Sequence, residues 1–244
     1  MSTKQEQVVY GVQACLALHA RRPGDIVRIF HSPGRAKQLA PLLRWAASRR
    51  VVYRQLDAEG MARAAGSPHH EGVVIVARPL TFRAMQPRDA EAASTWVLLD
   101  NVSNPHNLGA ILRTCGFFGV EAVIAGGVEP GSKVNAAAQR VSQGGAEAVR
   151  LFAAPMLPKA AGWLRRAGVT LIGLESDAPA ALEAVPMPWP CALVLGHEQT
   201  GLSPAIRQRC DRLAAIRGRG GVGSLNVSVA AGLAIAAMLR GAGR

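Results

Sequence analysis

Three short polar clusters in this sequence follow apolar runs and precede stretches with helical spacing. They are Asn104-Pro105-His106-Asn107, Gly196-His197-Glu198 and Ser224-Leu225-Asn226. The first turn of a helix has backbone N–H groups without intrahelical partners, and these groups bind anions. Amide, carboxylate and hydroxyl side chains beside such a turn can hold and orient a polar ligand. The clusters therefore predict a ligand-binding site.

The apolar runs in front of the clusters are predicted strands. Residues 96–100, 192–195 and 213–216 are short and almost wholly apolar, and segments with helical spacing separate them. Alternating strands and helices predict a doubly wound α/β fold with a parallel sheet. Ligands of such sheets bind at the carboxyl ends of the strands. We therefore expect the stretch 192–226, which holds two of the clusters, to be a cofactor site.

The familiar nucleotide-binding loops are absent from the sequence. No G-x-G-x-x-G follows the first strand of the predicted sheet, and there is no P-loop. A nucleoside cofactor would have to bind through the backbone of other loops. The candidates are the loops at Gly196, Ile216 and Leu225.

Arg113 lies six residues after Asn107 on the helix predicted to follow the first cluster. An arginine fixed there can clamp a substrate phosphate with two hydrogen bonds. Each polar residue also has a plainer explanation when taken alone. Asn107 is then a helix cap, Arg113 an exposed helix residue and Glu198 an ordinary loop residue.

The chain divides into an N-terminal unit (1–78), a linker (79–94) and a C-terminal unit (95–244). The first unit has predicted helices at 8–18, 36–48 and 57–65, the last capped by Asp57, and predicted strands at 26–30, 51–53 and 73–76,. This pattern predicts a small α/β unit. The linker is rich in Pro, Ala and charged residues and shows no periodicity. The final helix, after Asn226, is apolar on nearly every face, so we expect it to be buried in the core or against another subunit.

The charge of the chain favours nucleic acid as a partner. It has 28 Lys and Arg against 16 Asp and Glu, a formal net charge of +12,. Compositional drift explains the preference for Arg over Lys, but it does not explain the excess of base over acid. The many arginines of the first unit suit a phosphate-binding surface, or else a solvated face without a partner.

Metal, disulfide and membrane sites are not expected. The four cysteines are scattered without C-x-x-C spacing, and His70-Glu71 lacks the second histidine of a zincin because position 74 is Val,. No apolar run approaches the roughly 20 residues of a membrane span. The polar N-terminus lacks the apolar core of a signal peptide, so we expect a cytoplasmic protein.

The three clusters together resemble the motifs of a known family. The stretches 104–114, 193–203 and 224–232 look like the three motifs of the SpoU (TrmH-like) RNA ribose methyltransferases of the SPOUT superfamily, in order and spacing. The resemblance covers roughly residues 96–240. The first unit is similar to the family's N-terminal substrate-binding domain, which is related to a ribosomal protein fold.

The resemblance implies a fold, a reaction and a set of residues. The expected fold is a parallel-sheet methyltransferase domain with a deep trefoil knot, preceded by a small α/β RNA-binding domain. S-adenosylmethionine would bind at Gly196, Ile216 and Leu225. The expected reaction is methylation of a ribose 2′-hydroxyl in RNA by a homodimer, with rRNA favoured over tRNA as substrate. A non-catalytic RNA-binding or ribosome-assembly factor with the same fold is the alternative from another class. The residues implied in catalysis are Arg113, Asn107, Glu198, Ser224 and Asn226.

Chemistry restricts the role of Arg113. The pKa of an arginine side chain exceeds about 12, so a guanidinium is a poor general base. We expect Arg113 to position the 2′-oxygen and the adjacent phosphate and to stabilise negative charge there.

One segment departs from the family pattern. Relatives usually continue Ile216 with Pro-Met, whereas this chain continues with Arg217-Gly218-Arg219-Gly220-Gly221. We expect greater flexibility and added positive charge beside the cofactor site.

Overall fold

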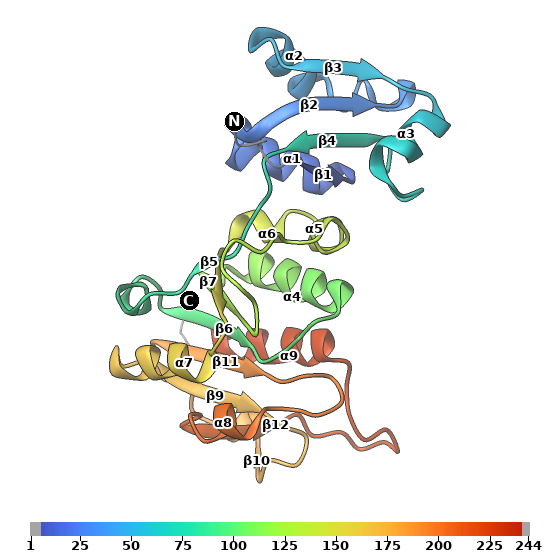
Figure 1. The fold of residues 1–244 in the computed structure, drawn as a ribbon. Coiled ribbons are helices and arrows are strands. Elements are labelled where there is room, and N and C mark those ends of the chain that lie inside the picture. The colour runs from blue at the N-terminus through green and yellow to red at the C-terminus, as the bar shows by residue number, and fades with distance from the viewer. Residues whose placement is uncertain (1–5, 241–244) are drawn as a thin grey trace.

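The N-terminal part of the chain forms a four-stranded sheet with the order β1-β4-β2-β3 (Figure 1). The computed structural model describes residues 6–240. The strands are β1 (Gln7–Tyr10), β2 (Ile26–His31), β3 (Val52–Gln55) and β4 (Val73–Ala77), with helices α1 (Val12–Arg21), α2 (Ala40–Ser48) and α3 (Ala58–Ala65). β4 runs antiparallel to β1 and β2, and β3 runs parallel to β2. Asp57 caps α3 as predicted, because its Oδ1 accepts a hydrogen bond of 2.8 Å from the N–H of Gly60.

Two helix boundaries in this part differ from the prediction. Val8 and Val9 belong to β1, and the helix begins only at Val12. Gly11 separates the two elements, since its φ of 94° lies outside the helical region,. The second helix begins at Ala40 rather than at residue 36, because the chain first makes the 3-10 turn η2 (Pro33–Arg35).

The C-terminal part is built on an eight-stranded sheet in which every neighbouring pair of strands is parallel. The order is β10-β12-β9-β11-β6-β7-β8-β5. The strands are β5 (Arg83–Ala84), β6 (Thr95–Leu99), β7 (Ala122–Gly126), β8 (Arg150–Ala154), β9 (Thr170–Leu174), β10 (Ala180–Ala181), β11 (Cys191–Leu195) and β12 (Arg212–Ala215). The predicted α/β class with a parallel sheet is confirmed.

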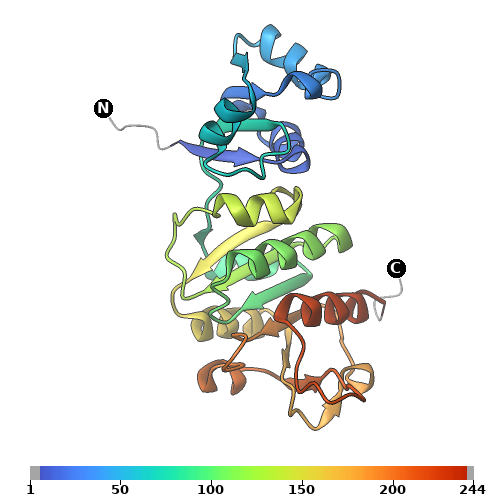
Figure 2. The same ribbon diagram turned by 90° about the vertical axis from the view of Figure 1, so that its right-hand side faces the viewer.

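Both faces of this sheet are covered by helices, so each strand carries two sets of core side chains. In β6, Val97 and Leu99 point into one core, and Trp96 and Leu98 into the other,. Helices α4 (Pro105–Phe118), α5 (Ala136–Ser142), α6 (Gly145–Ala148) and α9 (Val227–Arg240) cover the first face, and α7 (Leu157–Arg166) and α8 (Pro204–Arg207) cover the second. Figure 2 shows α5, α4 and α9 lying one below the other across the first face.

The segment predicted as a linker, 79–94, has structure of its own. β5 pairs with β8 at the edge of the large sheet, and the 3-10 helix η3 (Pro87–Glu91) follows. Met85, Ala90 and Ala93 are buried in the core beneath α7. Their spacing follows neither a strand nor a helix period, so sequence periodicity does not reveal their burial.

The two parts of the chain contact each other through α1, β1, α5 and α6. Two nitrogens of Arg22, after α1, donate to the Glu147 carboxylate in α6: Nε to Oε2 at 2.9 Å and to Oε1 at 3.1 Å, and Nη2 to Oε1 at 3.0 Å. This paired geometry is the most directional form of an arginine–carboxylate contact. It fixes the N-terminal sheet against the first face of the large domain.

The cysteines are free and mostly buried. Burial raises the pKa of the Cys115 thiol to about 12 and that of Cys191 to about 11, so both are protonated at neutral pH. Within residues 6–240, no helix has the length and apolar character that crossing a membrane would take. The polar N-terminus, which was expected not to be a signal peptide, consists largely of residues 1–5, and these lie outside the described residues.

Candidate functional site

A cavity of about 660 Å³ opens at the carboxyl edge of the large sheet. The loops that follow β11 and β12 and the first turns of α9 form its walls. These loops lie at the arrowhead ends of β9, β11 and β12 (Figure 1). Five of the residues singled out in the sequence line it, namely Gly196, Glu198, Ile216, Ser224 and Leu225.

The loop after β11 is closed on itself at Gly196. The N–H of His197 donates to the carbonyl of Gly201 at 3.0 Å, and the N–H of Gly201 donates back to the carbonyl of His197 at 2.9 Å. A Cβ at position 196 would lie 2.2 Å from the carbonyl carbon of Gly201. Only glycine therefore allows the two backbones to come this close.

Asn107 joins the first cluster to the other two. Its Nδ2 donates to Glu198 Oε1 at 2.5 Å, and its Oδ1 accepts a hydrogen bond of 3.1 Å from Nδ2 of Asn226. The Asn107 side chain belongs to a buried residue at the start of α4. Asn104 caps that helix by accepting from the N–H of His106 at 2.8 Å, so Asn107 is free for this bridge. The three-residue network Asn107–Glu198–Asn226 lies beside the cavity.

Asn226 has a second role at the start of α9. Its Oδ1 accepts from the backbone N–H of Ser228 at 2.9 Å and from the Ser228 hydroxyl at 2.6 Å. The side chain is thus a helix cap that also reaches back to Asn107. Because Asn226 bonds both to Ser228 in α9 and to Asn107 in α4, it fixes the position of α9 relative to α4.

Asp100 supports the loop after β11, a role that sequence reasoning missed. It is buried, and its Oδ2 accepts the N–H of Ser203 at 2.7 Å while Oδ1 accepts Nδ2 of Asn101 at 3.1 Å. The bond to Ser203 ties the end of the loop after β11 to the end of β6. The sequence held one signal that could have revealed this role: Asp100 is a carboxylate directly after an apolar run predicted to be a buried strand.

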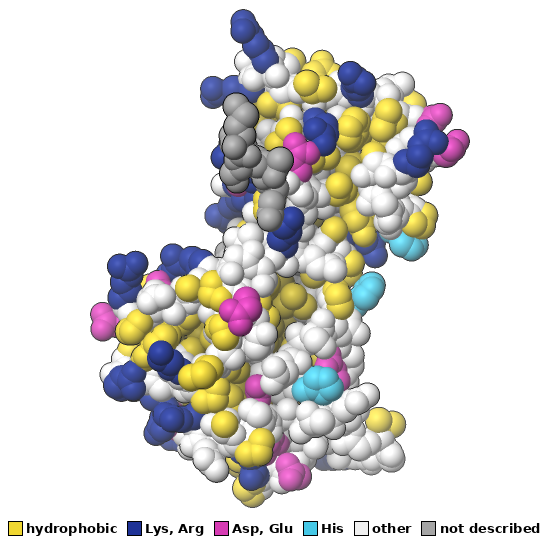
Figure 3. Space-filling view, in the orientation of Figure 1, with side chains coloured by type: hydrophobic (Ala, Val, Ile, Leu, Met, Phe, Trp, Pro, Cys, Tyr) yellow, Lys and Arg dark blue, Asp and Glu magenta, His cyan; other side chains and the backbone are white. Residues whose placement is uncertain are grey.

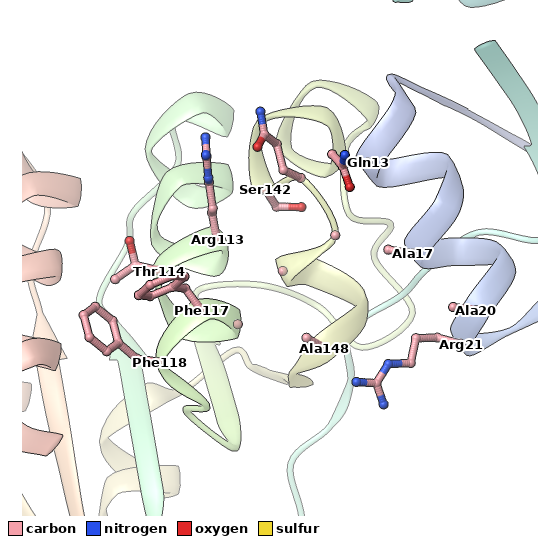
Figure 4. A pocket seen from close by; sticks show the side chains of 14 residues that line it. Gln13, Ala17, Ala20, Arg21, Arg113, Thr114, Phe117, Phe118, Ser142 and Ala148 are labelled. Carbon is pink, nitrogen blue, oxygen red and sulfur yellow. The ribbon is translucent and has the colours of Figure 1, made fainter. Parts of the chain in front are cut away.

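Arg113 is not part of the network. Six residues along a helix turn the side chain by about 120° and advance it by about 9 Å. Arg113 is exposed and lines a separate cleft of about 540 Å³ between α1, α4 and the turn from α5 to α6. Figure 4 shows Arg113 and Phe117 on α4, across from Gln13, Ala17 and Arg21 of α1. Of the five residues implied in catalysis, the structure therefore joins three by hydrogen bonds, places Ser224 in the cavity lining and places Arg113 at another surface.

The loop that departs from the family pattern, residues 217–221, is hydrogen-bonded to another segment through Arg217. Arg217 Nη2 donates to the carbonyls of Ala178 at 2.5 Å and of Pro179 at 2.9 Å. Arg217 thereby holds the cavity wall against the segment before β10. Residues 217–226 are otherwise exposed.

We predict that Asn107→Asp destabilises the fold by about 1–3 kcal/mol at neutral pH, because the change removes the donor to Glu198 and sets two carboxylates side by side. Mutual repulsion raises the pKa of such a pair, so stability should return as pH falls and one carboxyl takes up a proton. Thermal unfolding between pH 4 and 8 measures this. The matched control is Asn104→Asp, at an exposed cap where Asn and Asp serve equally. Equal melting temperatures for the two variants at every pH would contradict the prediction.

Comparison with known proteins identifies the chain. A family model described as "SpoU rRNA Methylase family" matches residues 94–236, and one described as "RNA 2'-O ribose methyltransferase substrate binding" matches residues 8–83. The first covers more than half of the chain. The chain belongs to the SpoU methylase family. The resemblance of the three sequence motifs is thereby confirmed.

Two relatives are similar to this SpoU family member along most of its length. One is the "Uncharacterized tRNA/rRNA methyltransferase YfiF" of Escherichia coli O157:H7, 34% identical over 231 residues, which are 94% of this chain and 66% of the relative. The chain thus spans just under two thirds of that protein. The other is the "23S rRNA (guanosine-2'-O-)-methyltransferase RlmB" of Escherichia coli K12, 33% identical over 236 residues, 94% of this chain and 96% of RlmB. The layout of the chain is therefore similar to that of RlmB.

A solved structure supports the fold. The SpoU methyltransferase AviRb of Streptomyces viridochromogenes, in complex with AdoMet, matches with a TM-score of 0.78 over 96% of this chain and 90% of AviRb, at 22% identity.

Within residues 6–240, no three His, Cys, Asp or Glu side chains gather as a metal site would require.

Proposed function

We propose that this SpoU family member transfers a methyl group from S-adenosylmethionine to a ribose 2′-hydroxyl of RNA, with rRNA as the substrate. The observation that carries the proposal is the Asn107–Glu198–Asn226 network beside the cavity at the strand ends. RlmB, similar along nearly its whole length, is named for 2′-O-methylation of 23S rRNA. An rRNA substrate also implies the cytoplasm as compartment.

The cavity suits S-adenosylmethionine in size and lining. Its volume of about 660 Å³ lies within the ordinary range of small-molecule sites,. Ile216, Leu225 and Leu195 offer apolar surface for an adenine ring, and the backbone at Gly196 and Ile216 offers polar groups for its edge. When bound, the cofactor supplies an electrophilic methyl group on a sulfonium. Gly196, Ile216 and Leu225 are the residues that we assign to holding it.

We assign Arg113 to stabilising negative charge on the ribose 2′-oxygen of the substrate. A ribose hydroxyl is a weak nucleophile unless negative charge on its oxygen is stabilised. The guanidinium of Arg113 can hold the 2′-oxygen and a neighbouring phosphate. Asn107 and Asn226 position the helix starts around the methyl-donor cavity, Glu198 holds Asn107, and Ser224 orients the ribose.

We propose a homodimer with its active sites where two copies meet. Arg113 faces away from the Asn107 network within one chain, so a second copy is a direct way to bring the two together. Apolar side chains on α4 and α9 are exposed, with 83% of Phe117, 51% of Val229 and 49% of Leu233 accessible. Burial of such side chains is the usual driving force of a stable interface.

We further propose that the C-terminal part is tied in a trefoil knot. The chain leaves β12 next to the edge of the sheet and returns to place α9 against α4, over the middle of the sheet. On the way, residues 222–225 share the cavity with the loop after β11. Threading of the C-terminal segment through that loop fits this path.

The N-terminal domain is assigned to RNA contact. Its exposed arginines include Arg44, Arg49, Arg50 and Arg54, and none of these forms an ion pair within residues 6–240. Free guanidinium groups on one domain suit binding to RNA phosphates. The match to a substrate-binding family model supports the same role.

The test is transfer of label from S-adenosylmethionine to RNA. Total RNA from a strain lacking this protein should accept label at a ribose 2′-oxygen, and mapping should place it in rRNA. Label in tRNA alone would make tRNA the substrate. Absence of transfer combined with absence of cofactor binding by calorimetry at millimolar concentration would leave the non-catalytic RNA-binding factor.

A further inference from the structure

A second basic surface lies at the opposite edge of the large sheet from the cofactor cavity. It is a hollow of about 560 Å³ between the end of α7, the start of β9 and the segment that leads from α8 into β12. Strands begin at this edge, whereas the cavity at Gly196 lies where they end. The residues that line it are Gly162, Arg165, Arg166, Gly168, Val169, Thr170, Arg209, Asp211 and Arg212. Lys and Arg side chains gather at the left of the C-terminal part in Figure 3, on the side where Figure 1 shows α7.

Two guanidinium groups of the hollow converge over Gly162. A Cβ on this residue would lie 3.3 Å from Nη1 of Arg209 and 3.7 Å from Nη1 of Arg166. The two nitrogens are therefore within about 7 Å of each other, the sum of those distances,. Because Gly162 has no side chain, the space between them is open.

The hollow holds more positive than negative charge. Among the described residues that line it, Asp211 alone is acidic. Asp211 pairs through Oδ1 with Arg165 at 2.8 Å and accepts the N–H of Leu171 through Oδ2 at 2.9 Å. Arg166, Arg209 and Arg212 form no ion pair within residues 6–240. The last turn of α7 favours a cation at Arg166 through the helix dipole. The dipole does not account for Arg209 and Arg212, which come from another part of the chain.

We propose that this hollow binds a backbone phosphate of the RNA substrate, away from the nucleotide that reacts. Guanidinium groups from two elements match the oxygens of a phosphodiester. Aromatic side chains are missing from the described lining, so the hollow offers no surface on which a base could stack,. The identity of the polyanion rests on the proposed function, whereas the anion site itself rests on the arginines alone.

The first test measures how RNA binding depends on salt. A labelled single-stranded RNA taken from the mapped target region is titrated with protein at several salt concentrations. The magnitude of the slope of log K against log salt should fall by about 0.7 in the double variant Arg166→Ala/Arg209→Ala, as expected when one phosphate of a single strand is no longer neutralised. The control Lys159→Ala/Arg88→Ala removes two charges from exposed positions near α7 and outside the hollow. Its slope should change less, and equal changes in both variants would overturn the proposal.

The second test does not involve RNA or methyl transfer. Gly162→Asp places a carboxylate between the two guanidinium groups, and Gly162→Asn places a neutral side chain of the same shape there. In low salt the melting temperature of Gly162→Asp should exceed that of Gly162→Asn, and high salt should remove the difference. Equal melting temperatures in low salt would refute the convergence of Arg166 and Arg209.

Inorganic phosphate separates a free anion from an RNA phosphate. Phosphate should raise the melting temperature of the unaltered protein more than that of Arg166→Ala/Arg209→Ala. A phosphate effect together with an unchanged RNA salt slope would overturn the RNA assignment. Because these readouts are binding and unfolding, a failure of methyl transfer would count against the proposed function and not against this site.

Discussion

Replacing Arg113 with alanine is expected to lower the turnover number of methyl transfer about 100- to 1,000-fold, the usual effect of removing one group that stabilises charge in a transition state. The Arg113 side chain makes no hydrogen bond to another residue of 6–240 and is exposed. Its loss should therefore leave the fold intact, with a stability change of about 0.5 kcal/mol or less. The measurement is single-turnover transfer of labelled methyl groups to RNA.

The control is Arg113→Lys, which keeps a positive charge but lacks the planar guanidinium group that can donate two parallel hydrogen bonds. It should retain part of the activity, because a point charge still stabilises the oxygen while two-pronged phosphate binding is lost. Cofactor affinity, measured by calorimetry, should be the same in both variants, since Arg113 is outside the cavity at Gly196. Undiminished label transfer in Arg113→Ala would remove the residue from the mechanism.

Gly196→Ala is expected to abolish cofactor binding and to destabilise the protein by about 1–3 kcal/mol, the usual range for steric overpacking that must be relieved by backbone movement. The added Cβ would meet the Gly201 carbonyl carbon at 2.2 Å and its oxygen at 2.4 Å. The backbone must move, which breaks the paired hydrogen bonds between His197 and Gly201. Calorimetry with S-adenosylmethionine and thermal unfolding test the two effects.

Gly218→Ala is the matched control, because Gly218 lines the same cavity and a Cβ there meets nothing within 4 Å. It should bind the cofactor with little change. If both alanine variants bound S-adenosylmethionine equally well, the tight turn at Gly196 would not shape the site.

Local sequence signals predicted most of the strands and helices. Short apolar runs became β6 and β11, in which all five residues are buried, because strands covered on both faces need apolar side chains at nearly every position,. Asp57 and Asn104 stand at the helix starts that their side chains stabilise,. These features depend on neighbours in sequence, so the sequence is sufficient to predict them.

The elements that were missed depend on distant partners. β1 is a strand because Val8 and Val9 pair with β4 across the sheet, although their spacing also suits a helix. β5 consists of two residues held by β8. Segments as short as these have no periodicity of their own, and pairing with a strand far along the chain decides their structure.

The family, the parallel sheet and the residues from which a site could be built all follow from the sequence alone. How those residues meet depends on packing in three dimensions. Asn107 bonds to residues 91 and 119 positions away, while Arg113, six residues on, faces a separate cleft. The reason is physical: the 100° turn per residue of an α-helix sets the direction of each side chain, but packing sets what lies in that direction. The same holds for the arginines over Gly162, which are ordinary charged residues in the sequence and neighbours only in the fold.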